Sequence, residues 1–444
     1  MTFFLLLTLL CDFYDPIFQK DLSLDLLAHR CKEIKAGSGS YINFYKPELL
    51  GRPSVVFSPE LKLLGFKLPE RCYLNSYLDL IFKLGIKTKD LSFFAKVDFF
   101  NFKESYKFPG WHPLSDASYF MYSFDEQPII GGKSILDINL REAYLSYDNN
   151  EFNLLVGRAN IRIGEGLLFS GNSYPLDYIY RVSFKLNNLK ILSAFAVPVD
   201  TFLRRTISYQ VLEWTPLPNL VFTLYEAVSH SDEDLFKYFN PITLYYERQR
   251  RGKSNSDNLL GGIALRYIFK KKTSVFIDVL NDDIVIFQGG TSKYAILAGF
   301  EALKSSNEIL RFSSVFIPRF TYTHVSDTNG WNIMGIPIGY PRGNDLVDFY
   351  FSYFRNLSED NSLIFRVAYL NKGEGTLFEK WEGSGFPRNM PFPSGKVRRD
   401  LVIMAGLKKK FFYFGSIIDL VYKGKDHALG VFLNFGKDLF RVVF

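Results

Sequence analysis

Short stretches in which apolar and polar residues alternate constrain the fold of this chain more than any other feature. Apolar residues occupy every second position in residues 181–187, and residues 136–141 repeat the pattern. A period of two places apolar side chains on one face of a β-strand and polar side chains on the other. From Leu74 onward, runs of about ten residues of this kind are separated by clusters of Asn, Asp, Gly, Lys and Pro. The pattern predicts strands and turns over most of the chain.

A barrel in a bacterial outer membrane accounts for this alternation together with the composition. The chain is 47% hydrophobic and 17% aromatic, which excludes a disordered protein. After residues 3–11, no run approaches the roughly 20 apolar residues of a transmembrane helix, which excludes a multi-span helical transporter. Aromatic residues cluster near predicted strand ends, and Phe440, Val442 and Phe444 share one face of the last predicted strand. A terminal aromatic of this kind is typical of barrels recognised by the barrel-assembly machinery.

The predicted barrel covers residues 71–444. About 370 residues, at roughly 20 to 23 per strand with its connection, give an antiparallel all-β barrel of 18 strands, with 16 as the alternative. Residues 1–11 are predicted to be an atypical export signal, because they are apolar but lack a preceding basic residue and a cleavage site. Residues 12–70 are predicted to be a periplasmic helical segment and lead-in, because apolar residues within 21–35 recur at helical spacing.

The sequence gives little support to nucleic-acid binding, metal binding or catalysis. The net charge is only +7 over 444 residues, and the basic residues are scattered, so no nucleic-acid partner is predicted. The five histidines are far apart and the three cysteines form no CxxC motif, so no metal or other cofactor is predicted, and pairing of Cys31 with Cys72 stays open. No GxSxG elbow, phosphate loop or dinucleotide fingerprint occurs, so the protein is predicted not to be an enzyme. A hydrolase assembled from separate strands is a further alternative.

A row of charged residues marks one predicted strand. Arg158, Asn160 and Arg162 alternate with apolar residues, which predicts a basic row facing the barrel lumen. One interpretation is a solvated lumen in which such arginines pair with carboxylates. The other is a binding surface for an anionic polymer. Trp331 and Trp381 lie in stretches rich in Gly, Pro, Ser or Asn, where their rings would either stack on sugars or anchor loops.

Residues 141–177, REAYLSYDNNEFNLLVGRANIRIGEGLLFSGNSYPLD, resemble the capsule-assembly outer-membrane protein family of Wzi-like barrels. The similarity consists of an acidic strand start, a Gly-Arg pair, a Gly-x-Gly turn and then Leu, Ser, Asn and Pro. Further similar stretches are Asn240-Pro241 followed by Tyr245-Tyr246-Glu247, then Gly335, Pro337, Gly339, Gly343 and Asp345, then Tyr369 with Gly373-Glu374, and the helical opening at residues 21–28. Ile163 departs from the pattern, because the family tends to have tryptophan there.

The resemblance implies an 18-stranded barrel, closed by helices on the periplasmic side, that acts as a surface lectin and helps retain capsule or exopolysaccharide without catalysis. The predicted partners are surface polysaccharide, outer-membrane lipid and the barrel-assembly machinery. The candidate ligand-binding residues are Arg158, Arg162, Glu165, Arg248, Trp331, Arg342, Asp345 and Trp381. The alternative function is a porin-type or specific channel for small solutes. A plugged lumen would favour the lectin, whereas a measurable conductance would favour the channel.

Overall fold

The computed structural model describes most of the chain from residue 54 onward. The described residues are 54–67, 72–87, 90–102, 135–149, 151–170, 176–198, 205–231, 237–240, 244–252, 257–269, 272–283, 293–305, 307–333, 336–340, 342–358, 361–381, 390–410, 415–423, 426–436 and 440–443. The predicted export signal, the predicted N-terminal helix and Phe444 lie outside these residues.

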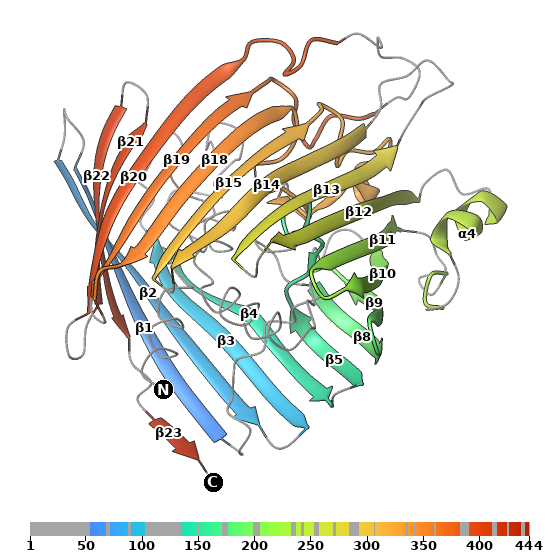
Figure 1. Cartoon of the computed structure of the whole chain (residues 1–444), viewed down its shortest axis with the longest axis horizontal. Helices are drawn as coiled ribbons and strands as arrows, with labels where there is room; N and C mark the ends of the chain where they lie inside the picture. The colour runs from blue at the N-terminus through green and yellow to red at the C-terminus, as the bar shows by residue number, and fades with distance from the viewer. Residues whose placement is uncertain are drawn as a thin grey trace.

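Nineteen of the described strands form a single antiparallel sheet that curves into a barrel (Figure 1). These strands are β1 (Ser54–Lys67), β2 (Cys72–Lys87), β3 (Leu91–Phe102), β4 (Ile135–Asp148), β5 (Phe152–Ala159), β8 (Leu176–Leu186), β9 (Leu189–Val197), β10 (Thr206–Leu217), β11 (Leu220–His230), β12 (Asn258–Phe269), β13 (Thr273–Asp283), β14 (Lys293–Ser305), β15 (Glu308–Ile317), β18 (Leu346–Asn356), β19 (Asn361–Lys372), β20 (Arg398–Lys410), β21 (Gly415–Lys423), β22 (Asp426–Gly436) and β23 (Phe440–Val443). The connections contain two small hairpins and two helical segments, which are β6 (Arg162–Ile163) with β7 (Phe169–Ser170), β16 (Asn332–Ile333) with β17 (Ile336–Pro337), the helix α4 (Tyr245–Gly252) and the 3-10 turn η3 (Asp327–Asn329). No helix among the described residues is long and apolar enough to cross a membrane.

The sheet closes on itself through its first strand. β1 pairs with β2 on one side, and on the other side it pairs with β22 and β23, which contact successive parts of β1. Because β22 and β23 form one interrupted strand, the nineteen strands occupy 18 positions around the wall among the described residues. Closure pairs the backbone groups of every strand and leaves no open edge. The prediction of an 18-stranded antiparallel barrel is therefore confirmed.

The barrel begins earlier than the predicted residue 71. β1 starts at Ser54 and pairs with β2 along nearly its whole length. Pro59 and Glu60 interrupt the apolar pattern of this strand, so only a short alternating stretch remains to identify it. Its partners β22 and β23 come from the far end of the chain, and no local pattern reveals that pairing.

The two ends of the barrel differ in the length of their connections. At one end, named here the short-turn end, connections of two to four residues join successive strands, for example β8 to β9 and β14 to β15. At the opposite end, the long-loop end, the connections include residues 160–175, 231–257, 318–345 and 373–397. This asymmetry is typical of outer-membrane barrels, whose short turns face the periplasm and whose long loops face the outside.

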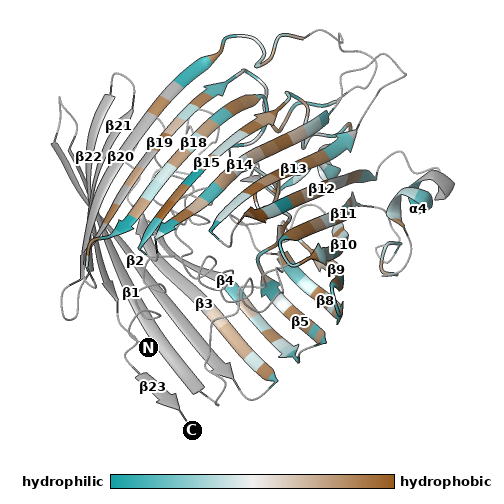
Figure 2. Ribbon diagram, in the orientation of Figure 1, coloured by the Kyte–Doolittle hydropathy of each residue, from teal (hydrophilic) through white to brown (hydrophobic). Residues whose placement is uncertain are grey.

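Hydrophobic and hydrophilic residues alternate along the coloured strands of the wall (Figure 2), and their exposure assigns them to an outer and an inner face. On β13, Val275 and Ile277 are 42% and 41% exposed, whereas Phe276 and Asp278 between and beside them are buried. Outward apolar side chains suit contact with lipid, and the inner face accommodates buried polar and charged groups. The predicted alternation thus corresponds to the two faces of the wall.

A lysine on the outer face is expected to destabilise the barrel. Ile263 of β12 is 48% exposed and pairs with Leu224 and Val279 on the lipid-facing side. Ile263→Lys should lower the free energy of unfolding by about 2–4 kcal/mol, because the charge would enter the hydrocarbon region. Denaturant unfolding in lipid vesicles measures the change. Ile263→Val is the control and should cost about 1 kcal/mol or less; equal losses for the two variants would contradict the lipid-facing assignment.

Candidate functional site

Two connections at the long-loop end fold into the barrel and fill part of its interior. We call residues 160–170 and the described part of 318–345 the plug. Residues 160–170 link β5 to β8, yet Glu165 reaches Arg266 of β12 and Asp278 of β13, several strands further around the wall. The Tyr322 hydroxyl of the second plug connection donates a 2.8 Å hydrogen bond to the Leu168 carbonyl of the first. The two connections therefore form one unit inside the barrel.

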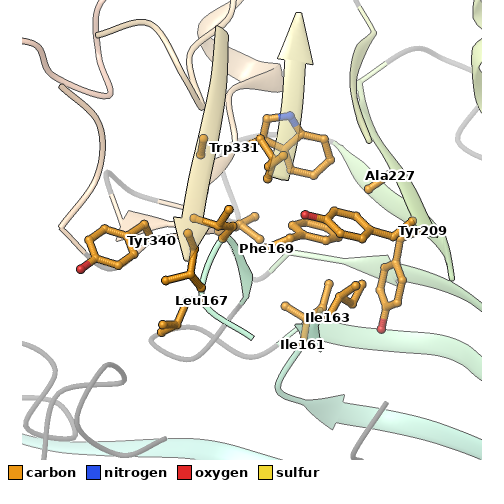
Figure 3. Packing of buried hydrophobic residues seen from close by; sticks show 14 of the residues in the cluster. Ile161, Ile163, Leu167, Phe169, Tyr209, Ala227, Trp331 and Tyr340 are labelled. Carbon is orange, nitrogen blue, oxygen red and sulfur yellow. The ribbon is translucent and has the colours of Figure 1, made fainter. Parts of the chain in front are cut away.

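Aromatic rings form the centre of the plug (Figure 3). The ring of Phe169 stacks on Tyr225 of β11 with 6.0 Å between centroids. It also meets Trp331 edge-on at 5.5 Å and Tyr209 of β10 edge-on at 6.0 Å. All four side chains are buried, and Trp331 has no exposed surface. The plug and the inner face of the wall thus share one hydrophobic core.

A network of buried charges lies beside this core. The guanidinium of Arg266 makes a two-pronged contact with Glu165 and a 2.5 Å ion pair with Glu301. Arg311 contacts the second oxygen of Glu301 at 3.3 Å, and Ser274 accepts a 2.7 Å hydrogen bond from Arg266. The four charged side chains are at most 7% exposed. Charged groups buried away from water are stable only when they are paired or hydrogen-bonded in this way. The network therefore holds the plug against the wall.

Glycine permits the tight turn at the tip of the first plug connection. Gly164 and Gly166 adopt φ values of +59° and +69°, which side chains rarely allow. A Cβ on Gly164 would lie 2.5 Å from the Asp278 carboxylate. That carboxylate accepts 3.0 Å hydrogen bonds from the Glu165 amide and the Tyr225 hydroxyl. The Gly-Glu-Gly sequence is therefore an internal turn that places Glu165 against Arg266.

Side chains of the wall hold the second plug connection through its backbone. Arg205 donates to the carbonyls of Thr328 at 3.1 Å and Gly330 at 2.7 Å. Lys293 donates a 2.9 Å hydrogen bond to the carbonyl of Thr323. Both basic side chains are buried, so these carbonyls replace the water that they would otherwise bind. The position of the connection is thus determined by two charged anchors.

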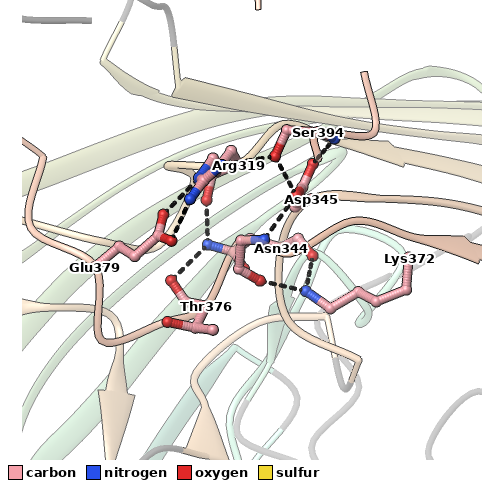
Figure 4. A network of polar contacts seen from close by, with 8 residues as sticks. Arg319, Asn344, Asp345, Lys372, Thr376, Glu379 and Ser394 are labelled. Atoms are coloured by element: carbon pink, nitrogen blue, oxygen red, sulfur yellow. Dashed lines mark hydrogen bonds and ion pairs between the residues drawn. The ribbon is translucent and has the colours of Figure 1, made fainter. Parts of the chain in front are cut away.

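A second polar network ties the plug to the connection formed by residues 373–397 (Figure 4). Asp345, which is fully buried, accepts hydrogen bonds from the Gly375 amide at 2.7 Å and from the Ser394 amide and hydroxyl at 2.9 and 2.6 Å. Arg319 forms an ion pair with Glu379 at 2.5 Å and donates to the Ser394 hydroxyl at 3.0 Å. The described parts of this connection, residues 373–381 and 390–397, are therefore held against the plug at several points.

The prediction of a lumen-facing row that includes Arg158 is wrong. Arg158 forms a two-pronged ion pair with Asp177, at 2.7 and 2.8 Å, on the same face as the exposed Val156. The inner positions belong to Ala159 and Ile161, which are buried in the core shared with the plug. The predicted orientation of this strand assumed that the lumen is polar. The plug instead packs apolar residues against the inner face of the strand. Arg162 lies in β6, within the plug.

Most of the other candidate residues build the plug or its attachments. Glu165 and Asp345 belong to the two networks above, and Arg342 is buried in a 2.5 Å ion pair with Asp348 of β18. Trp331 is buried rather than exposed in a loop, so its ring is not accessible to a sugar. Two further candidates lie elsewhere: the half-buried ring of Trp381 lies 4.4 Å from the Lys293 ammonium, and Arg248 of α4 lies 5.9 Å from the centre of the Tyr238 ring.

A group of exposed aromatic and basic residues was not among the sequence candidates. Phe378 and Phe392 are 61% and 45% exposed on the connection 373–397, and Lys396 and Arg399 nearby are also exposed. We call these four residues the rim. In the sequence, the only indication is an aromatic residue between prolines, followed within seven positions by three basic residues. The rim combines rings that can stack on sugars with cations that can pair with acidic groups.

The described residues show little that resembles a catalytic or metal centre. No three His, Cys, Asp or Glu side chains among them are close enough to hold a metal ion. His230 lies 2.8 Å from the Thr206 hydroxyl, but both side chains are buried, and the His230 ring packs edge-on against Tyr238 at 4.9 Å. That pair is therefore inaccessible to a substrate in this structure.

Comparison with known proteins identifies the fold. No known sequence family and no curated protein sequence matches the chain. Among solved structures, Wzi, a carbohydrate-binding β-barrel of the outer membrane involved in group 1 capsule assembly in Escherichia coli, is similar with a TM-score of 0.57 at 11% identity, over 94% of this chain and 92% of Wzi. OccK11 of Pseudomonas aeruginosa gives a TM-score of 0.46 at 9% identity, over 89% of this chain and all of its own. OccAB4 of Acinetobacter baumannii gives 0.47 at 10%, with the same coverage. The chain is an antiparallel β-barrel of the bacterial outer membrane.

Removal of the central arginine of the buried network is expected to destabilise the protein strongly. Arg266→Met removes the guanidinium that contacts both Glu165 and Glu301. The free energy of unfolding should fall by about 3–5 kcal/mol, because an uncompensated charge remains buried. Arg355→Met is the matched control, since the Arg355–Glu308 pair is half-exposed and should contribute about 1 kcal/mol or less. Equal stability of the two variants in denaturant unfolding would contradict the anchoring role of Arg266.

Proposed function

We propose that this outer-membrane barrel binds surface polysaccharide and helps retain capsule or exopolysaccharide on the cell, without catalysing a reaction. The observation that supports this most is the plug, which fills part of the lumen with a hydrophobic core. A channel for small solutes needs a continuous polar, hydrated path. Where the plug meets the wall, the inward side chains of Tyr209, Phe276 and Leu297 are buried in that core.

The architecture is consistent with this function. Wzi, a barrel of similar fold, is a carbohydrate-binding protein involved in capsule assembly. In both proteins the alignment spans nearly the whole chain, so the similarity is not confined to a few hairpins. A barrel that presents fixed loops at the cell surface suits retention of a polymer that is already outside the cell.

The rim is the surface that we assign to the ligand. Its rings would stack on sugar faces, and Lys396 and Arg399 would pair with carboxylate or phosphate groups of an acidic polysaccharide. Asp345 and Arg319 fix the connection that carries most of the rim before any ligand arrives. A preorganised loop loses less conformational entropy on binding, which favours affinity. The rim thus takes the role first expected of Trp331.

Two measurements on the purified protein distinguish binding from transport. In planar bilayers, the protein should show no stepwise ion conductance, because the plug blocks part of the lumen. In a sedimentation or surface-binding assay, it should bind polysaccharide isolated from its own source organism. Stepwise conductance without polysaccharide binding would reject the proposal in favour of a porin-type channel.

Variants of the rim test the assigned surface. Lys396→Gln with Arg399→Gln should weaken binding of an acidic polysaccharide about tenfold, which is about 1.4 kcal/mol, and should flatten its salt dependence. Phe392→Ala should weaken binding with little change in salt response. The control is Lys185→Gln with Lys272→Gln, two exposed lysines at the short-turn end. If the rim and control variants bind alike while both are folded, the ligand does not bind at the rim.

A further inference from the structure

The connection between β11 and β12 folds back over the outside of the wall. We call its described residues, 237–240 and 244–252, the flap. The Tyr180 hydroxyl of β8 donates a 2.7 Å hydrogen bond to the Phe239 carbonyl, and the Phe239 ring meets Phe195 of β9 at 5.3 Å. The Tyr245 amide donates a 3.0 Å hydrogen bond to Glu226 of β11. The flap therefore contacts several adjacent strands, and Figure 1 shows α4 beside the end of β11 and β12.

The residues beneath the flap belong to the face of the wall opposite the plug. On β11, Tyr225 and Ala227 point inward and join the plug core. Val228, the next residue, packs instead with Tyr238 and Tyr245 of the flap in a separate cluster. Because successive side chains of a strand point to opposite faces, the flap lies on the outer surface of the barrel.

The flap lies at the edge of the lipid-facing surface that is nearest the long-loop end. The outward positions that it covers include the polar Ser193, Ser208 and Glu226 beside the apolar Phe195 and Val228. Further along the same strands toward the short-turn end, the outward positions are apolar and exposed: Phe184, Ile191, Trp214 and Ile263 are 41–49% exposed. Because this band of exposed apolar side chains lies on the short-turn side of the flap, the flap lies beside the headgroup layer of the outer leaflet.

The flap combines exposed apolar residues with a helix rich in basic residues. Leu244 and Tyr246 are 62% and 61% exposed. The helix α4 that follows contains Arg248, Arg250 and Arg251 against one carboxylate, Glu247. Apolar and aromatic side chains next to clustered arginines are typical of segments that lie at the interface of a membrane with anionic headgroups.

We propose that the flap binds the phosphorylated glycolipid of the outer leaflet. Leu244 and Tyr246 would enter the boundary between acyl chains and headgroups, and the arginines of α4 would pair with the phosphates. The planar guanidinium matches two phosphate oxygens at once, which lysine does not achieve. The contact of Arg248 with the Tyr238 ring holds that guanidinium against the flap. This lipid site is independent of polysaccharide binding at the rim.

Native mass spectrometry of the full-length barrel in detergent, with purified bisphosphorylated lipid A as the probe, tests the site. Arg248→Gln with Arg250→Gln and Arg251→Gln should weaken lipid A binding about tenfold or more. The matched control removes the same charge at the opposite end through Lys185→Gln, Lys272→Gln and Lys304→Gln, which are exposed near short turns. Its affinity should stay within about twofold of the parent.

A second variant and a second probe keep the outcome clear. Arg250→Gln with Arg251→Gln leaves the Arg248–Tyr238 contact intact, so it should fold as the parent does and still lose about fivefold in affinity. Dephosphorylated lipid A should bind the parent about as weakly as bisphosphorylated lipid A binds the triple flap variant. The proposal is overturned if the folded double variant keeps full affinity, or if removing the phosphates leaves binding to the parent unchanged.

Discussion

The contact between Arg266 and Glu165 is the interaction on which the interior of this barrel depends. It joins the tip of a connection that starts at β5 to a strand several positions away around the wall. A buried guanidinium or carboxylate is unstable in the hydrophobic interior without a partner of opposite charge, so Arg266 and Glu165 stabilise each other. The stacked ring of Phe169, the turn at Gly164 and the hydrogen bond from Tyr225 to Asp278 all follow from the position that this pair imposes.

The wall separates two environments that the same strands must satisfy. Its outer face is apolar because it meets lipid, and its inner face carries charges that are paired with the plug. Near the long-loop end both faces are covered by protein. There the flap covers polar and apolar residues of the outer face, while Trp331 and its neighbours cover the inner face. The barrel therefore has protein packed on both sides of β11 and β12 near the long-loop end, and these strands meet lipid only closer to the short-turn end.

The sequence predicted the wall better than the contents of the lumen. Alternation in parts of β4 and β8 reflects the two faces of the wall, so the fold class and the 18 strand positions were predictable. Arg158 was placed on the wrong face because alternation does not say which face is inside once apolar loops enter the lumen. The burial of Trp331 depends on Phe169, which is distant in the chain, and β1 depends on β22 and β23. No local pattern reports such contacts, and the exposed rim has no periodicity at all.

The sequence separations within the plug have a consequence for the order of folding. Neighbouring strands at the short-turn end are joined by a few residues, whereas Glu165 is 101 residues from Arg266, and Leu168 is 154 residues from Tyr322. Contacts that close such long loops cost more entropy and form after local hairpins. Closure of the wall joins residues that are still farther apart, since Leu63 of β1 pairs with Leu433 of β22. A molecule on its way to the native state therefore forms its local hairpins first, and both the closed wall and the filled interior follow them.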